Sequence, residues 1–206
     1  MDEADGATTG DGRAVDRAGR PLATSPRVIA AMAQKLFVEK GFAATSVADV
    51  TAAVGISQRT FFRYFSAKGD VLWVESAAEL ARFRAALSAA DPDEPYQQGL
   101  LRAVLAAFTW TPADEQWARD RAQLVLSEPA VQGQFSVILS QWRAAAAEHA
   151  RRQPPAATAE VAVVVGYAFV AGLLAANERW VSEPSRDLGT LLAEVLAMVL
   201  PAVSAP

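Results

Sequence analysis

Helix breakers divide this sequence into segments of helical length, and this spacing limits the folds that the chain can adopt. The segments are rich in alanine and leucine, and the sequence has no run of alternating apolar and polar β-branched residues that would suggest a strand. The breakers are Gly41, Gly55, the cluster Asp91–Pro95, Pro112, Pro129, the pair Pro154–Pro155, and Pro184. We therefore predict an all-α protein of about nine helices.

The helices nearest the N-terminus have clear start and stop signals. Ser25 followed by Pro26 is typical of a helix start, with serine as the N-cap and proline at the first helical position. Gly41 can end this helix in a left-handed conformation. A second helix is predicted to begin at Ser46, because Ser46 and Asp49 have the spacing of a capping box. The apolar residues at helical spacing in the first helix are Ile29, Ala33, Leu36 and Phe37.

A tight turn joins the second helix to a third short helix. Gly55 can end the second helix, and Ser57 can cap a helix running from Gln58 to Tyr64. Two short helices joined by a turn that contains glycine are typical of a helix-turn-helix motif. Phe61 and Phe65 are four residues apart and should face the first two helices. The motif therefore predicts an N-terminal three-helix DNA-binding domain.

The outward face of this third helix is the predicted base-reading surface. Recognition helices place their N-terminal residues against base edges, where arginine and glutamine can pair bidentately with guanine and adenine. We expect Gln58, Arg59 and Thr60 to contact bases and Arg63 to contact either bases or phosphates. We expect phosphate contacts from Tyr64, from Lys68, and from Thr45 and Ser46 as caps of the second helix. The predicted DNA-binding residues are Thr45, Ser46, Ser57, Gln58, Arg59, Thr60, Phe62, Arg63, Tyr64 and Lys68.

Lys68 belongs to this set through its position. It lies in the first turn of a predicted fourth helix, where its charge opposes the helix dipole. A solvated surface lysine is one interpretation. The position directly after the helix-turn-helix favours a phosphate contact shared with the N–H groups of the helix start.

The charge distribution agrees with DNA binding, although the net charge of −4 does not suggest it. Residues 1–11 carry a charge of −4, residues 12–68 carry +6, and residues 69–206 carry −6. A basic module on an acidic body is the pattern expected of a DNA-binding protein. A chance fluctuation of surface charge would give the same pattern, so it is supporting information only.

The residues of the motif together resemble the DNA-binding signature of the TetR family. The resemblance covers roughly residues 26–74, about a quarter of the chain. It implies a homodimer that binds a palindromic double-stranded DNA operator as a repressor and is released by a small-molecule effector. The matching residues are Leu36, Phe37, Lys40–Phe42, Ala44, Thr45–Ser57, Thr60–Phe65, Lys68 and Asp70–Leu72.

Two details refine this resemblance. Phe62 stands where the family most often has a tyrosine whose hydroxyl reaches a phosphate, so that hydrogen bond is not expected, while Tyr64 keeps a phenol nearby. The string Phe61–Phe65 and Trp73 also resemble the branch that contains the mycofactocin-system regulator. This narrower resemblance implies an apolar or amphipathic effector that is acyl-CoA-like, because the ligands of that branch are long-chain acyl-CoA thioesters.

We expect three segments along the chain. Residues 1–22 are predicted to be a disordered arm because they lack apolar residues that could form a core. Residues 23–70 form the predicted helix-turn-helix domain, and residues 71–206 the predicted C-terminal helical ligand-binding and dimerisation domain. The fourth and fifth helices are expected at about 67–90 and 96–110. A sixth helix should start at the capping box Thr111–Asp114, and a seventh should end at about 151–152. The eighth should contain the apolar run from Val161, and the ninth should span about 186–200.

The uncharged run Val161–Asn177 is 17 residues long. A membrane span needs roughly 20 apolar residues, so a buried helix is the better interpretation. In the family the last two helices form the dimer interface, and small residues would allow close helix approach there. The alternative is close packing within one subunit. These small residues are Gly166, Ala168, Ala171, Gly172, Ala175 and Ala176.

The candidate ligand-binding residues are the large aromatic side chains of the middle helices and two polar residues. Small-molecule pockets are lined by apolar and aromatic side chains with a few polar groups. Each aromatic residue could equally be an ordinary core residue. The candidates are Phe108, Trp110, Trp117, Arg121, Trp142, Phe169 and Asn177.

The composition argues against an enzyme. With no cysteine, the chain cannot form disulfides, thiolate metal sites or a cysteine nucleophile, which also fits a cytoplasmic location. The single histidine, His149, makes a histidine metal site or a Ser-His-Asp triad hard to build and is expected to be an ordinary surface or helix-end residue. We expect no metal, cofactor or membrane association. A helical adaptor without DNA binding is a further alternative, and Arg59, Arg63 and Lys68 argue against it.

Overall fold

The computed structural model describes residues 25–91, 93–153 and 158–200, and the predicted arm at 1–22 lies outside them. The described residues form nine α-helices and three short 3-10 helices and no strand, which confirms the predicted fold class. The elements are α1 (Pro26–Lys40), α2 (Val47–Val54), α3 (Gln58–Tyr64), η1 (Lys68–Trp73), α4 (Ser76–Ser88), α5 (Tyr96–Ala107), η2 (Pro112–Asp114), α6 (Glu115–Ser127), η3 (Pro129–Val131), α7 (Gln132–Arg151), α8 (Ala159–Ser182) and α9 (Leu188–Val199).

The predicted helix starts are confirmed by their capping hydrogen bonds. The Ser25 side chain accepts from the backbone N–H of Val28, and the Ser57 side chain accepts from that of Thr60. Ser46 and Asp49 form the predicted capping box at the start of α2. The second capping box, at Thr111, is also present, but it opens the short η2 that precedes α6. These signals are local in sequence, which is why they could be read without the fold.

The predicted fourth helix is in fact two elements, η1 and α4, separated at Val74 and Glu75. Val71 and Leu72 of η1 are fully buried in one hydrophobic core, whereas Leu80 and Phe83 of α4 are buried in another. A single straight helix could not bury both pairs of residues, because the two cores lie in different directions from it. The break allows the chain to change direction between them.

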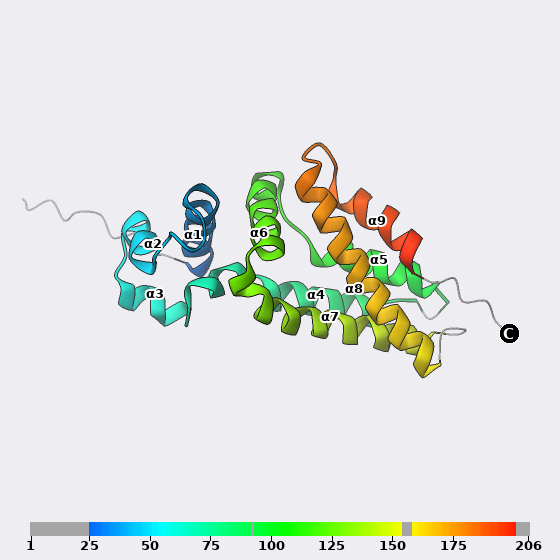
Figure 1. Cartoon of the computed structure of the whole chain (residues 1–206). Coiled ribbons are helices and arrows are strands. Elements are labelled where there is room, and N and C mark those ends of the chain that lie inside the picture. Colours follow the sequence, from blue (N-terminus) through cyan, green and yellow to red (C-terminus); the bar gives the residue numbers. More distant parts are fainter. Residues whose placement is uncertain (1–24, 92, 154–157, 201–206) are drawn as a thin grey trace, which may run out of the picture.

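The two cores define an N-terminal head (residues 26–73, α1 to η1) and a body (α4 to α9). Figure 1 shows the head at one end of the molecule and α5, α8 and α9 at the other. The core of the head is not closed by the head alone, because Leu124 and Val125 of α6 and Val131 of η3 belong to it. Since α6 also packs against α8, it connects the head to the body.

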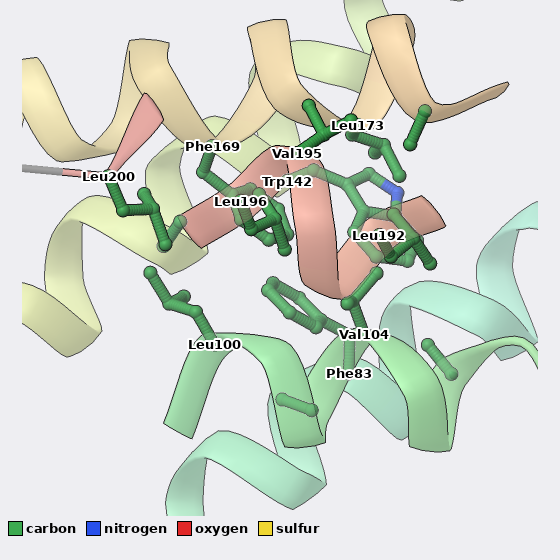
Figure 2. Packing of buried hydrophobic residues seen from close by; sticks show 14 of the residues in the cluster. Phe83, Leu100, Val104, Trp142, Phe169, Leu173, Leu192, Val195, Leu196 and Leu200 are labelled. Carbon is green, nitrogen blue, oxygen red and sulfur yellow. The ribbon is translucent and has the colours of Figure 1, made fainter. Parts of the chain in front are cut away.

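The core of the body is built around stacked aromatic rings (Figure 2). The ring of Phe83 lies 4.7 Å from that of Trp142 and 5.3 Å from that of Phe169, measured between centroids. Leu192 and Leu196 of α9 pack in the same cluster from the other side. Stacked rings of this kind bury large apolar areas and fix the relative positions of α4, α7 and α8.

The uncharged run of the sequence lies in α8, which packs between α7 and α9. By length and composition alone α8 could cross a membrane, but one of its faces is buried in the body and supplies Val165, Phe169 and Leu173 to the core. The opposite face is exposed. The prediction of a buried helix is therefore confirmed for one face only.

Two of the small residues expected at a dimer seam instead allow close packing within the subunit. A Cβ atom on Gly166 would lie 2.9 Å from the carbonyl oxygen of Arg143 in α7. A Cβ atom on Gly172 would lie 2.8 Å from a methyl group of Leu196 in α9. Both glycines and Ala176 are buried, so the alternative interpretation holds for these three residues, while Ala171 is exposed.

Candidate nucleic-acid interface and internal pocket

The turn between α2 and α3 orients the candidate recognition helix. Gly55 ends α2 with φ 75° and ψ 35°, a left-handed conformation that costs glycine little. The N–H groups of Gly55 and Ile56 both donate to the carbonyl of Thr51, at 2.9 and 3.0 Å. This closes the reversal, and Ile56 packs against the core of the head. The predicted helix-turn-helix is therefore present, with α3 as its second helix.

The two faces of α3 differ sharply in exposure. Phe61 is fully buried and Phe65 is 6% exposed, as predicted, and they fix α3 on the core of the head. The exposed face carries the candidate DNA contacts, including a ring that is 52% exposed at Phe62. Its exposed residues are Gln58, Arg59, Phe62, Arg63 and Tyr64. A helix that is anchored by two aromatic residues and carries mostly polar residues on its outer face is suited to lie in a major groove.

Arg63 and Tyr64 interact with each other on this surface. A guanidinium N–H of Arg63 donates to the hydroxyl of Tyr64 at 2.8 Å, and the Arg63 Cζ atom lies 4.7 Å from the centre of the Tyr64 ring. The arginine is therefore held at the C-terminal end of α3 together with a phenol. Both groups can donate hydrogen bonds to phosphate oxygens.

The serine and threonine residues of the motif are occupied by capping. Ser46 donates its hydroxyl hydrogen to the carboxylate of Asp49 at 2.5 Å, and this hydrogen bond holds the pKa of that carboxyl below its usual value. Ser57 and Thr60 share a hydrogen bond of 3.0 Å between their hydroxyls. Ser46 and Ser57 are exposed and Thr60 is half-buried, so all three remain accessible from solvent.

Thr45 does not lie where a phosphate contact requires it. The residue is 1% exposed, and its hydroxyl donates to the carbonyl oxygen of Gly41 at 2.9 Å and to that of Leu36 at 3.3 Å. The side chain therefore satisfies the C-terminal end of α1. The expectation that Thr45 caps α2 and touches DNA is wrong, because Ser46 is the cap and the Thr45 hydroxyl points inward.

Lys68 is also engaged inside the protein. Its ammonium group donates to the carbonyl oxygens of Phe42 at 2.6 Å and Thr45 at 2.8 Å, and it lies 4.3 Å from the centre of the Phe42 ring. It thereby ties η1 to the loop between α1 and α2. These contacts favour an internal structural role for Lys68, and the expected phosphate contact stays a prediction.

A pocket that is partly open to solvent lies in the body between α4, α6, α7 and α8. Five of the predicted ligand-binding residues line it: Phe108, Trp110, Arg121, Trp142 and Asn177. Two others do not. Phe169 is fully buried in the core against Phe83, and Trp117 lies outside the lining between two arginines.

Sequence reasoning missed several residues of the pocket wall. The main ones are Trp73, Glu79, Phe135, Leu139 and Trp180. They come from η1, α4, α7 and α8, which are distant along the chain. Aromatic and aliphatic residues are typical both of pocket walls and of hydrophobic cores. Their residue types therefore could not assign them to the pocket, and only the fold separates the two uses.

The polar groups of the pocket are concentrated around one ion pair. Arg121 donates to Glu79 at 2.6 Å, and the two side chains are 13% and 9% exposed. A second nitrogen of Arg121, Nη1, is buried and has no hydrogen-bond partner among the described residues. The indole nitrogens of Trp73 and Trp180 are in the same situation. All three groups are donors, and they line a largely apolar pocket.

The geometry thus combines a helix-turn-helix head with an all-helical body that contains an apolar pocket, which is the construction of a one-component transcriptional regulator. Comparison with known proteins identifies the family. Residues 29–72 match the model of the bacterial regulatory proteins of the tetR family, and residues 94–204 match that of the MftR C-terminal domain. The chain therefore belongs to the TetR family of DNA-binding transcriptional regulators, with a C-terminal domain of the MftR type.

A relative supports this assignment, and solved structures share the fold. A Mycobacterium tuberculosis protein described as a mycofactocin biosynthesis transcriptional regulator, MftR, is 30% identical over 184 residues, which are 89% of this chain and 93% of the relative. The fold is similar to that of the TetR family regulator PfmR from Thermus thermophilus (TM-score 0.56, 23% identity, 84% of this chain and 96% of that one). It is also similar to a tetR family regulator from a Shewanella species (TM-score 0.55, 21% identity, 86% and 97% coverage).

Proposed function

We propose that this regulator binds a palindromic DNA operator as a homodimer, represses transcription, and is released by a small apolar or amphipathic effector. The observation that carries the proposal is the exposed face of α3. This face carries polar and basic side chains, and the buried residues Phe61 and Phe65 hold the helix on the core of the head. Arginine and glutamine at the N-terminal end of such a helix have the donors and acceptors needed to read base edges. The acidic body behind it would give DNA no comparable surface.

Within this interface we assign different roles to neighbouring residues. Gln58 and Arg59, at the start of α3, are the base-reading candidates, with Thr60 beside them. Arg63 and Tyr64, held together at the end of α3, are phosphate-contact candidates. Base contacts carry sequence information, whereas phosphate contacts position the protein with little sequence preference.

A mobility-shift titration tests the interface with the chain's own upstream DNA. Arg59→Ala should weaken operator binding by about 1–3 kcal/mol per half-site and leave binding to random DNA almost unchanged. Arg84→Ala is the matched control, since Arg84 is an exposed arginine of α4 in the body. If Arg59→Ala weakens operator and random DNA equally, Arg59 does not read bases.

We infer that the dimer forms through the outer face of α8 and the end of α9. This face exposes large apolar side chains that the subunit leaves uncovered, with exposed fractions of 51% for Val163, 56% for Val164, 59% for Tyr167 and 71% for Met198. Contiguous exposed apolar residues usually mark an interaction surface. The family resemblance supports a second copy of this chain as the partner.

The pocket in the body is the proposed effector site. Its wall is mainly aromatic and aliphatic, and it is bounded by Trp73 of η1, in the head, and by Leu173 and Asn177 of α8. An acyl-CoA-like thioester would fit this class, since its acyl chain is apolar and its thioester and nucleotide are polar. A ligand in this position contacts elements that belong to both the head and the body, as release of DNA requires.

A further inference from the structure

The indole of Trp117 lies between two guanidinium groups that belong to different parts of the molecule. The Cζ atom of Arg27, in α1 of the head, lies 4.8 Å from the Trp117 ring centre. The Cζ atom of Arg121, one turn further along α6, lies 5.3 Å from it. Arg121 also lines the pocket. Trp117 therefore touches both a head arginine and a pocket arginine.

The Arg27 end of this stack fastens the head to the body. Arg27 donates to Glu75, at the start of α4, at 2.9 Å and to Asp114, at the start of α6, at 2.7 Å. Asp114 accepts from Thr111 as well, and these hydrogen bonds lower the pKa of its carboxyl. Any shift of the Trp117 indole would change its contact with the Arg27 guanidinium, which bridges these two carboxylates. The position of α1 relative to α4 and α6 depends on the same contacts.

The Arg121 end opens into the pocket with an unused donor. One guanidinium nitrogen of Arg121 binds Glu79, whereas Nη1 is buried without a partner among the described residues. The buried indole N–H groups of Trp73 and Trp180 line the same pocket, also without acceptors. A buried donor without an acceptor is unfavourable, and a ligand acceptor placed there would satisfy it. No pocket-lining side chain of the described residues has a matching buried acceptor without a partner.

We propose that the effector carries a hydrogen-bond acceptor, a carboxylate or a thioester or amide carbonyl, that binds Arg121 Nη1, and that the stack Arg121–Trp117–Arg27 transmits this contact to the head. The inference rests on the proposed role of the pocket as the effector site and names the residues that read the ligand. An acceptor draws the guanidinium toward the pocket and away from the indole. The indole then loses one of its two cationic neighbours, and its contact with Arg27 changes.

The first experiment tests which head group the pocket accepts. Dodecanoate and dodecylamine have the same apolar chain, but the first presents an acceptor and the second a cationic donor. Below their micelle concentrations, dodecanoate should raise the melting temperature of the full-length protein clearly more than dodecylamine does. Arg121→Met combined with Glu79→Gln removes both charges of the pair together and should abolish this preference. Equal stabilisation by both compounds, or no binding of dodecanoate to the wild-type protein, would overturn the acceptor assignment.

The second experiment tests the connection to the head. In the wild-type protein, dodecanoate should weaken binding to the upstream DNA by about tenfold, within the usual range of allosteric coupling. The Trp117→Leu variant should still bind dodecanoate, as measured by the melting-temperature shift. Dodecanoate should, however, change the affinity of this variant for the upstream DNA by less than about twofold. Trp117→Phe keeps an aromatic face and should restore the coupling.

The outcomes separate this inference from the proposed function. Trp117→Leu that keeps the full tenfold response would show that the stack is not the connection. A Trp117→Phe variant that is as uncoupled as Trp117→Leu, although both are folded and bind dodecanoate, would also overturn the aromatic link. Failure of the ligand-free wild-type protein to bind its upstream DNA would instead contradict the proposed DNA-binding function.

Discussion

At the scale of single residues, the fold places basic side chains in different environments. Arg59 is exposed on the outer face of α3, whereas Lys68 is bound to two backbone carbonyls. His149 is a third case. It was expected at a surface or helix end, and it does lie in the last turn of α7, but it is only 4% exposed and packs against Gly99.

Burial determines how His149 responds to pH. Loss of hydration lowers the pKa of His149 from its ordinary value of 6.5, and Arg152 lowers it further, while Glu94 opposes the shift. The unfolded chain therefore binds a proton at a higher pH than the folded protein does. The stability associated with neutral His149 is complete above pH 6.5 and decreases as the pH falls from there toward the folded-state pKa.

Urea denaturation at about pH 8 and about pH 5.5 measures this effect. The wild-type protein should lose stability at the lower pH, with a contribution from His149 of at most about 1.4 kcal/mol per pH unit. His149→Met cannot titrate and should lose less. If the two proteins show the same pH dependence, the histidine is protonated equally in the folded and unfolded states.

At the scale of elements, short contacts between neighbouring segments hold the recognition helix in place. Phe61 and Phe65 anchor α3 on the core of the head, and the turn at Gly55 fixes the start of α3. Lys68 adds a connection from η1 back to the loop between α1 and α2. The geometry of the reading surface therefore depends on residues that need not touch DNA themselves.

Lys68→Ala separates a structural role from a phosphate contact. The substitution leaves the carbonyls of Phe42 and Thr45 without their ammonium donor, so the protein without DNA should be less stable by about 1–3 kcal/mol. The salt dependence of operator binding should keep its slope, because no phosphate partner is lost. An unchanged melting temperature together with a slope reduced by about one unit per subunit would instead identify a phosphate contact.

At the scale of the whole molecule, two features fit the proposed response to a ligand. The core of the head is completed by Leu124 and Val125 of α6, so the head cannot move without disturbing the body. The outer face of α8 is apolar and uncovered, so a second subunit can be held at a fixed position. Movement of α6 in each subunit would then change the separation of two heads on a dimeric frame.

Light scattering tests the dimer. The wild-type mass at micromolar concentration should be about twice that of one 21.9 kDa chain. Ala171→Arg places a charge on the exposed face of α8 and should give monomer or aggregate. Ala81→Arg, on the exposed face of α4, is the control and should leave the mass unchanged. A wild-type mass near that of one chain would contradict the proposed interface.

The sequence by itself determined the all-α class, most helix boundaries and the helix-turn-helix, because the signals that specify them span only a few residues. Capping boxes such as Ser46–Asp49 involve side chains three residues apart. Gly55 sets a turn through its own backbone conformation. Phe61 and Phe65 show which face of α3 is inward by their spacing alone.

The tertiary structure decided which residues meet across long stretches of chain. Lys68 binds a carbonyl 26 residues away, and Arg121 pairs with Glu79 42 residues away. The same fold placed Trp180 on the pocket wall and Phe169 away from it, although both are buried aromatic residues of one helix. Local spacing gives the face of a helix but not its neighbours, because these depend on how all the helices pack together.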